Sequence, residues 1–218
     1  TSDHHPPRSA VESARRTIAI ERQAVEQLEH RIDDSFTKAV DLLASVEGRV
    51  IVSGMGKSGH IGNKIAATLA STGTPAQFVH PAEACHGDMG MITRSDAALL
   101  MSNSGTTSEI TALLPLLKRL GVPIVAMTGN DASTLATAAD VHLNIGVSEE
   151  ACPLDLAPTA STTANLVMGD ALAIALLEQS GFTAEDFAFT HPGGALGRRL
   201  LTRVSDVVVS GDDVPRVT

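Results

Sequence analysis

Apolar residues recur every seven positions at the start of the chain, which is the spacing of a helix with one apolar side. The residues of this stripe are Val11, Ile18, Val25, Ile32, Ala39 and Val46. A second seam beside it is filled by Ala14, Leu28 and Leu42. Because Asp33-Asp34-Ser35 provides capping side chains, we expect two helices, ended by Glu47-Gly48. The pattern predicts a helical arm that packs on its own domain or on a neighbouring subunit, and it favours neither.

Five short apolar runs follow, and helical patterns separate most of them. The runs are Val50 to Ser53, Ala76 to Val79, Ala97 to Met101, Pro123 to Met127 and Val141 to Ile145. We expect crossover helices over Lys57 to Ser71, Ser108 to Leu120 and Ser133 to Ala138. Apolar strands that alternate with helices are typical of a parallel sheet covered on both faces. The sequence therefore predicts a three-layer, doubly wound α/β fold of the flavodoxin-like type, with five parallel strands.

The remainder of the chain divides into two helices and a tail. Thr159 to Gln179 has the pattern of a long, mostly apolar helix closed by Ser180-Gly181, and a shorter helix follows Gly193-Gly194. The tail loses periodicity, and its Val207-Val208-Val209 run resembles the first strand of another unit. We expect an arm over residues 1–46, an α/β domain over 47–203 and a linker over 204–218.

Composition narrows the classes of function. With 218 residues and 43% apolar content, the chain can bury one full core. A net charge of −9 and the lack of Trp and Tyr argue against nucleic acid as a partner. The longest apolar runs are shorter than a membrane span, and Thr1 to Pro7 lacks the layout of a signal peptide. We therefore expect a cytoplasmic protein without a membrane partner, whose Cys85 and Cys152 are reduced thiols.

A turn rich in hydroxyl groups follows the third apolar run. Five of the seven residues from Ser102 to Ser108 carry a hydroxyl. A buried strand that ends in such a turn and feeds a helix gathers hydroxyls, free backbone N–H groups and a positive helix end, which together bind anions. Thr106 to Glu109 also fits the S/T-x-x-E capping box, and this pattern alone favours a cap over chemistry for Glu109.

The glycine-rich segment after the first strand superficially matches two nucleotide signatures. A P-loop needs a glycine six positions before Lys57, but Ile51 stands there. Gly54, Gly56 and Gly59 satisfy G-x-G-x-x-G, yet the second strand ends without the acid that binds a ribose, which disfavours a dinucleotide. Lys57 and Ser58 remain as a second wall for an anionic ligand.

Three loops carry further acid, imidazole and thiol groups. His80 to Asp88 holds five such side chains in nine residues, but their spacing fits no closed zinc pattern. Glu149-Glu150 and Thr190-His191 are the other candidates. Taken singly, each is more typical of a solvated loop charge or of a hydrogen-bonded turn histidine.

Taken together, segments along most of the chain form a recognisable pattern. They are Gly54 to Gly62, Ala70 to Pro75, Phe78 to Pro81, Met101 to Gly105, Cys152 to Leu154, Leu156 to Thr159, Met168 to Leu172, Gly181 to Phe187 and His191 to Gly197. These segments resemble the sugar isomerase (SIS) domain of bacterial D-arabinose 5-phosphate isomerases, roughly from Ile18 to Val209. Relatives in this group continue into two CBS modules, so residues 204–218 are expected to begin the first.

The resemblance implies interconversion of D-ribulose 5-phosphate and D-arabinose 5-phosphate, which supplies the Kdo sugar of lipopolysaccharide. It also implies a homotetramer that needs no cofactor. The matching catalytic positions are Lys57, Glu109, Glu150 and His191. Positions that match the family's substrate site are Gly73, Thr74, His80 and His86, to which the residue patterns add Ser58, Ser102, Ser104 and Thr107. The position that matches His80 can take an inhibitory zinc ion, which turnover does not require.

The chemistry gives these residues roles. Glu150 is expected to move the proton between C1 and C2 through a cis-enediol, while Lys57 stabilises the developing oxyanion. His191 would open the furanose ring or relay a proton, and Glu109 would orient the substrate or Lys57. The hydroxyl turn would bind the phosphate. Two other functions stay open: a module that senses sugar phosphates without turnover, and an SIS isomerase of another sugar phosphate.

Overall fold

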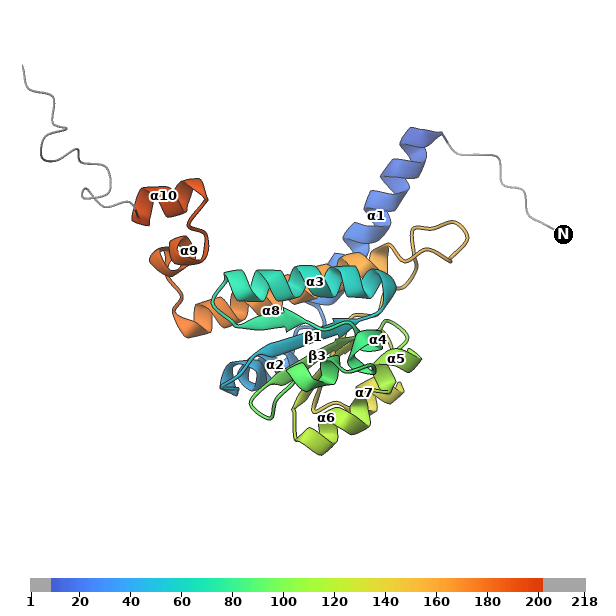
Figure 1. Cartoon of the computed structure of the whole chain (residues 1–218). Helices are drawn as coiled ribbons and strands as arrows, with labels where there is room; N and C mark the ends of the chain where they lie inside the picture. The colour runs from blue at the N-terminus through green and yellow to red at the C-terminus, as the bar shows by residue number, and fades with distance from the viewer. Residues whose placement is uncertain (1–8, 202–218) are drawn as a thin grey trace, which may run out of the picture.

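The computed structural model describes residues 9–201 as a three-layer α/β fold with an arm on one side (Figure 1). Its five strands are β1 (Val50–Gly54), β2 (Ala76–Phe78), β3 (Ala97–Met101), β4 (Ile124–Thr128) and β5 (Val141–Asn144). They pair in parallel in the order β2-β1-β3-β4-β5. The predicted doubly wound fold is confirmed. The expected strand at Val207 and the linker over 204–218 lie outside the described residues.

Helices cover both faces of this sheet, whereas the last two helices of the described chain stand away from it (Figure 1). The longer ones are α1 (Ala10–Glu29), α2 (Asp34–Ser45), α3 (Gly56–Ser71), α6 (Leu114–Leu120), α8 (Ala160–Ser180), α9 (Ala184–Thr190) and α10 (Ala195–Leu201). The short ones are α4 (Pro81–Ala84), α5 (Ser108–Thr111), α7 (Thr134–Ala138) and a 3-10 turn over Asp88–Met91. One core lies between the sheet and α2, α3 and α8, and the second lies between the sheet and α4 to α7.

Strands β1, β3 and β4 are buried throughout, because their side chains alternate between the two cores. In β1, Val50 and Val52 join the core under α3 and α8, whereas Ile51 joins the opposite core. In β3, Leu99 and Leu100 alternate in the same way. Since both faces are covered, these strands have no polar face, which is why they appear in the sequence as continuous apolar runs.

The single helix expected over Ser108 to Leu120 is wrong, because the chain forms α5 and α6 there instead. Pro115 lies in the first turn of α6. Its ring has no N–H to donate and clashes with the carbonyl four residues earlier, at Thr111, where α5 ends. Proline is tolerated in the first turn of a helix, so a new helix begins there.

The arm consists of α1 and α2, and the predicted cap between them is confirmed because the Asp33 side chain accepts from the Ser35 N–H at 2.8 Å. The side of α1 that is buried against its own chain consists of Ile20, Ala24 and Leu28. The heptad stripe does not lie on one side: Val11 and Ile18 of α1 face outward, with exposed fractions of 59% and 67%, whereas Ala39 of α2 is buried in the core. The outer part of α1 protrudes from the body of the molecule (Figure 1).

Helix α8 is the one helix of the described part that is long and apolar enough to span a membrane, but half of its apolar window is buried inside the protein. It packs against α1, α2 and α3. A helix with neighbours on several sides needs apolar residues around most of its circumference, which explains its composition.

Candidate active site

The strand order places the ends of β1 and β3 side by side at the carboxyl edge of the sheet. From β1 the chain crosses to β2 on one side, and from β2 it returns to β3 on the other side. This point is the topological switch of a doubly wound sheet, where ligands generally bind. The hydroxyl turn after Met101 and the glycine-rich segment after Gly54 therefore face each other across one opening.

The hydroxyl turn is organised around Ser102, which is only 3% exposed. Its Oγ lies 2.7 Å from Thr107 Oγ1 and 3.5 Å from Ser104 Oγ, and it accepts from the Gly105 N–H at 3.1 Å. The backbone of the turn is held from outside, because Gly129 donates to the carbonyl of Asn103 at 2.9 Å. The turn is thus a preorganised group of hydroxyls at the mouth of the sheet.

The capping box predicted for Thr106 and Glu109 is wrong. The residue that caps α5 is Thr107, and it makes no side-chain capping bond. The Thr106 hydroxyl donates to Ser104 at 3.2 Å, and the Thr107 hydroxyl bonds to Ser102. Both threonine hydroxyls therefore have partners within the turn and do not cap the helix. The Glu109 carboxylate accepts from the Ser108 hydroxyl at 2.7 Å.

The facing wall is the start of α3, where Lys57 and Ser58 lie in the first helical turn. The residue that precedes the helix, Met55, offers no side-chain cap to its first N–H groups. A 16-residue helix carries a partial positive charge at such an end. The Lys57 ammonium adds a full charge, so this wall favours an anion.

Glu150 reaches the same opening from the long connection between β5 and α8. Its Oε2 accepts from the Thr159 N–H at 2.6 Å, from the Thr159 hydroxyl at 2.9 Å and from the Ser161 N–H at 3.3 Å. Burial raises the pKa of this carboxyl, but the hydrogen bonds from Ser161 and Thr159 outweigh burial and hold the pKa below its ordinary value. Glu150 is therefore a fixed, ionised carboxylate at neutral pH.

These three parts line one open cavity of about 490 Å³. Six of the predicted site residues line it, namely Lys57, Ser58, Ser102, Ser104, Thr107 and Glu150. Sequence reasoning missed Asn103, Asp155, Ser161 and Thr162, which also line it. Asn103 lies within the hydroxyl turn, so its position in that turn was a usable signal. The other three lie close to the start of α8. No sequence pattern indicated that this part of the chain lies near the end of β1.

Glu109 and His80 lie beside this cavity and do not line it. A hydrogen bond from Ser108 lowers the pKa of the Glu109 carboxyl, as do its own backbone N–H and the charge of the nearby His80 ring. His86 lies on an exposed turn after α4, with Nδ1 2.8 Å from the carbonyl oxygen of Ala82. Glu109 and His80 thus form a second polar group next to the cavity.

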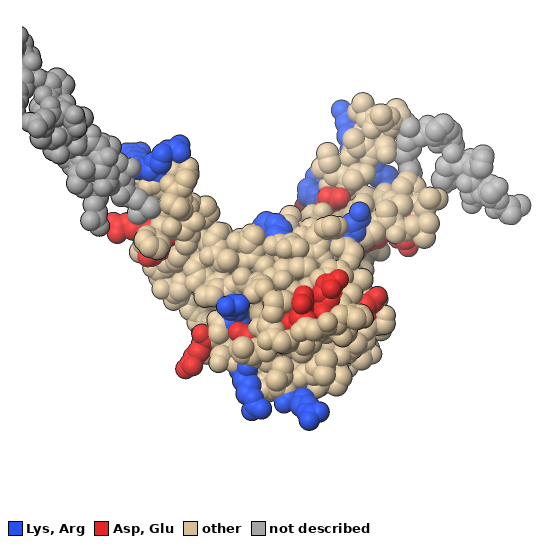
Figure 2. Space-filling model, in the orientation of Figure 1, with Lys and Arg blue, Asp and Glu red and all other residues tan. Residues whose placement is uncertain are grey.

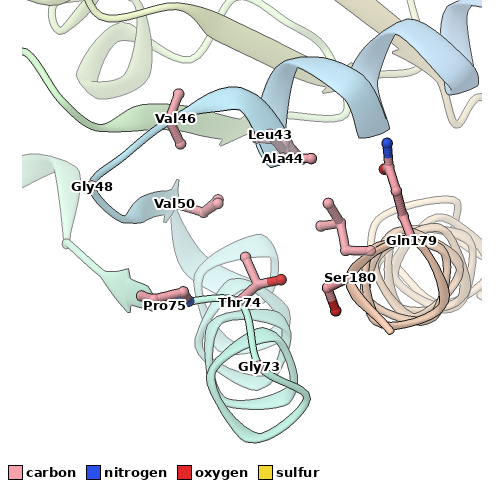
Figure 3. A pocket seen from close by; sticks show the side chains of 11 residues that line it. Leu43, Ala44, Val46, Gly48, Val50, Gly73, Thr74, Pro75, Gln179 and Ser180 are labelled. Carbon is pink, nitrogen blue, oxygen red and sulfur yellow. The ribbon is translucent and has the colours of Figure 1, made fainter. Parts of the chain in front are cut away.

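Gly73, Thr74 and His191 lie elsewhere, at the amino end of the strands. Gly73 and Thr74 follow α3, about 24 Å of helix away from Lys57. They line a different cavity of about 300 Å³ with residues of α2 and α8 (Figure 3). His191 ends α9, where its ring stacks on Phe187 with centroids 4.1 Å apart. Within one chain, the predicted site residues therefore fall into two groups.

Metal binding needs several ligating side chains close together. Over residues 9–201, no three His, Cys, Asp or Glu side chains are grouped closely enough to hold a metal ion. His80 has Glu109 as its charged neighbour. The inhibitory zinc expected at His80 stays a prediction.

Comparison with known proteins gives a consistent family. The SIS domain model matches residues 42–175. Arabinose 5-phosphate isomerase KdsD of Pseudomonas aeruginosa is 66% identical over 207 residues, which are 95% of this chain and 64% of that protein. KdsD of Escherichia coli K12 is 59% identical over 206 residues, covering 94% of this chain and 63% of that protein.

The solved structure of c3406 from E. coli CFT073, in complex with arabinose 5-phosphate, superposes with a TM-score of 0.81 and 44% identity. The superposition covers 84% of this chain and 97% of that one. The chain spans less than two thirds of the length of the two KdsD relatives. Since the family model covers more than half of the chain, and its matched segment contains the switch-point cavity, the chain belongs to the SIS domain family.

Proposed function

We propose that this chain is an aldose–ketose isomerase that interconverts D-arabinose 5-phosphate and D-ribulose 5-phosphate. The observation that carries the proposal is one cavity that combines a hydroxyl turn, the Lys57 ammonium and the ionised Glu150 carboxylate. The identity to the KdsD isomerases supports this substrate pair. The D-arabinose 5-phosphate formed in this way would supply synthesis of the Kdo sugar of lipopolysaccharide.

The phosphate would bind at the hydroxyl turn. Ser104 and Thr107 offer hydroxyls beside Ser102, and the first-turn N–H groups of α3 face them across the cavity. A phosphate dianion gains from several donors and from a helix end at once. Because the phosphate does not react, its binding energy can be used to hold C1 and C2 in place.

Glu150 is the proposed base. In the aldose, the carboxylate would take the proton from C2 while O1 gains a proton, which gives a cis-enediol. Return of the carried proton to C1 and loss of the O2 proton then complete the ketose. Lys57 would stabilise the charge that develops on the oxygens during both transfers. The fixed position of Glu150 suits a group that must reach two neighbouring carbons.

Charge placement outside the cavity agrees with a small anionic ligand and not with nucleic acid. In the view of Figure 2, acidic side chains gather over the region of α4, and basic side chains form small separate groups, one of them on α10. A nucleic-acid surface needs a continuous basic patch. We expect the reaction to take place in the cytoplasm, since phosphorylated sugars carry charges that do not cross membranes unaided.

We further infer that the chain works as a homotetramer in which a neighbouring subunit brings His191, and with it Gly73 and Thr74, to the cavity. The separation of these residues from Lys57 along α3 supports this inference. The outward stripe of α1, with Val11 and Ile18 exposed, offers an apolar surface for such a neighbour. His191 would then open the furanose ring or relay a proton.

Dilution tests the shared site. If His191 comes from a neighbour, specific activity should fall as the assembly dissociates, and mass photometry at the same concentrations should record the loss of tetramer. Mixing His191→Ala subunits with Lys57→Ala subunits should restore part of the activity. Full activity in a monomer would contradict the shared site and leave His191 without a role in turnover.

A proton-exchange experiment tests the function itself. We expect the chain to convert arabinose 5-phosphate to ribulose 5-phosphate in heavy water. Deuterium should enter at C1 of the product and, through the reverse reaction, at C2 of the remaining arabinose 5-phosphate, as followed by NMR. Turnover should survive a chelator, because the proposed chemistry uses side chains alone. Binding of the sugar phosphate by folded protein without conversion would indicate a sensing module instead.

A further inference from the structure

Helix α1 and the turn that follows it hold the loop that carries Glu150 through a row of polar contacts. From the turn, Arg31 donates to the carbonyl of Gly146. From α1, Gln27 donates to Ser148 at 3.3 Å, and Arg16 contacts the loop on both sides of Glu150. The matched SIS segment begins at residue 42, so α1 lies outside it whereas the loop lies inside. Helix α1, which lies outside the matched SIS segment, thus contacts the Glu150 loop of the proposed site.

Arg16 contacts the residues directly before and after the catalytic position. Its Nη1 donates to the carbonyl of Ala151 at 2.7 Å, and its Nη2 lies 3.4 Å from Glu149 Oε2. The residue between these two contacts is Glu150. A planar guanidinium offers donors in a fixed fork, so the two contacts limit rotation of the backbone there.

The backbone held by Arg16 leads directly to the Glu150 carboxylate. The Ala151 N–H donates to Thr159 Oγ1 at 2.8 Å, and Thr159 donates through its own N–H and hydroxyl to Glu150 Oε2. The Ala151 side chain is 4% exposed and packs with Ile20 and Ala24 of α1. Movement of α1 away from this loop would therefore loosen the bonds that orient the carboxylate.

We propose that Arg16 is a positioning residue that orients Glu150 through the backbone of residues 149–151. The proposal rests on the proposed function for the role of Glu150, but the contacts it uses exist independently of turnover. The charged groups near Glu150 are Glu149 on its own loop, Arg16 from α1, Lys57 from α3 and Asp155 on the cavity wall. Glu21 of α1 accepts from the Thr163 hydroxyl further along α8. Arg16 acts on Glu150 without touching the substrate.

Kinetics of Arg16→Ala test the proposal. We expect kcat to fall by about 10-fold or more while KM changes by less than about 2-fold, because the base loses its orientation and the phosphate site is untouched. Arg16→Lys keeps the positive charge but loses the forked arrangement of donors, so its kcat should lie between those of the unchanged chain and of Arg16→Ala. The matched control is Arg15→Ala, since Arg15 is exposed and the described residues give it no ion pair or side-chain hydrogen bond. Its kcat should equal that of the unchanged chain.

A titration that needs no turnover separates the two proposals. Protein labelled with ¹³C at glutamate carboxyls, with the Glu150 signal assigned by its loss in Glu150→Gln, reports the pKa of Glu150. In Arg16→Ala this pKa should rise toward its ordinary value, because the bonds from Thr159 weaken, and in Arg15→Ala it should not. If the unchanged chain does not isomerise the sugar, the proposed function fails, yet this titration still tests the positioning.

Three results would overturn the role of Arg16. The first is a folded Arg16→Ala protein with unchanged kcat and an unchanged Glu150 pKa. The second is an equal loss of kcat in Arg15→Ala, which would indicate a general charge effect. The third is a rise in KM at constant kcat. If Arg16→Ala fails to fold, Arg16→Lys and Thr159→Val test the same path from its two ends.

Discussion

Replacing Glu150 with Gln is expected to reduce kcat about 1,000-fold while arabinose 5-phosphate still binds. General base catalysis contributes about 10²–10⁴-fold, and an amide cannot take the proton from C2. Gln keeps the size of the side chain and an oxygen that can still accept from the Thr159 N–H, so the cavity should retain its shape. Deuterium exchange at C2 should disappear, and calorimetric binding of the substrate should remain.

The control for this variant is Glu178→Gln, a change of the same type near the far end of α8, where the side chain is exposed. Its kcat should equal that of the unchanged chain. Turnover of Glu150→Gln within about 10-fold of the unchanged chain would reassign the base. Glu109 would then be the next candidate, since its pKa is also lowered and it lies beside the cavity.

The same variant has a stability consequence whose sign follows from the lowered pKa of Glu150. A carboxyl with a folded pKa below its unfolded pKa stabilises the protein above the unfolded value. That contribution disappears as the pH falls through the folded value. Glu150→Gln should therefore have a lower Tm than the unchanged chain at pH 7, and the difference should shrink in acid. A difference that grows in acid would mean that the carboxyl is not stabilised in its ionised form.

The fold was predictable because its signals are local. Continuous apolar runs of four or five residues, such as Ala97 to Met101, predict doubly covered strands, and all five were placed within one or two residues. The helix break at Pro115 was equally local and was missed only because the apolar period continues across it. The side of α1 that is buried was not predictable, since heptad spacing does not say which neighbour covers a stripe.

The cavity was predictable in part. Strand ends and turn chemistry gave the hydroxyl turn and Lys57, because parallel strands gather their carboxyl ends at one edge. The capping box failed since Ser102 and Ser104 compete for the threonine hydroxyls, a competition that spacing does not reveal. The bonds from Thr159 to Glu150 join residues nine positions apart through a loop that has no periodic pattern. Such bonds depend on how the chain folds in three dimensions. The same is true of the contacts between α1 and this loop.

The second large effect is expected at Gly105, in the middle of the hydroxyl turn. Gly105 has a φ of +66°, and a Cβ there would lie 2.0 Å from Ser133 Oγ. An alanine therefore carries left-handed strain of about 1–2 kcal/mol, and the turn must also move away from Ser133. Tm should fall by about 2–8 °C, and KM should rise about 10-fold or more because the bonds of Ser102 to Gly105 and Thr107 are disturbed.

The matched control for Gly105→Ala is Gly121→Ala. Gly121 ends α6 with a φ of +77°, but an added Cβ there would meet nothing within 4 Å. The Gly121→Ala variant therefore introduces backbone strain without a clash, so Tm should fall modestly and KM should stay constant. Adding Ser133→Gly to Gly105→Ala removes the clashing atoms, and glycine still serves at the start of α7. This double variant should regain most of the lost affinity. If KM stays high in it, the phosphate site depends on the conformation of Gly105 itself and not on the space that Ser133 leaves.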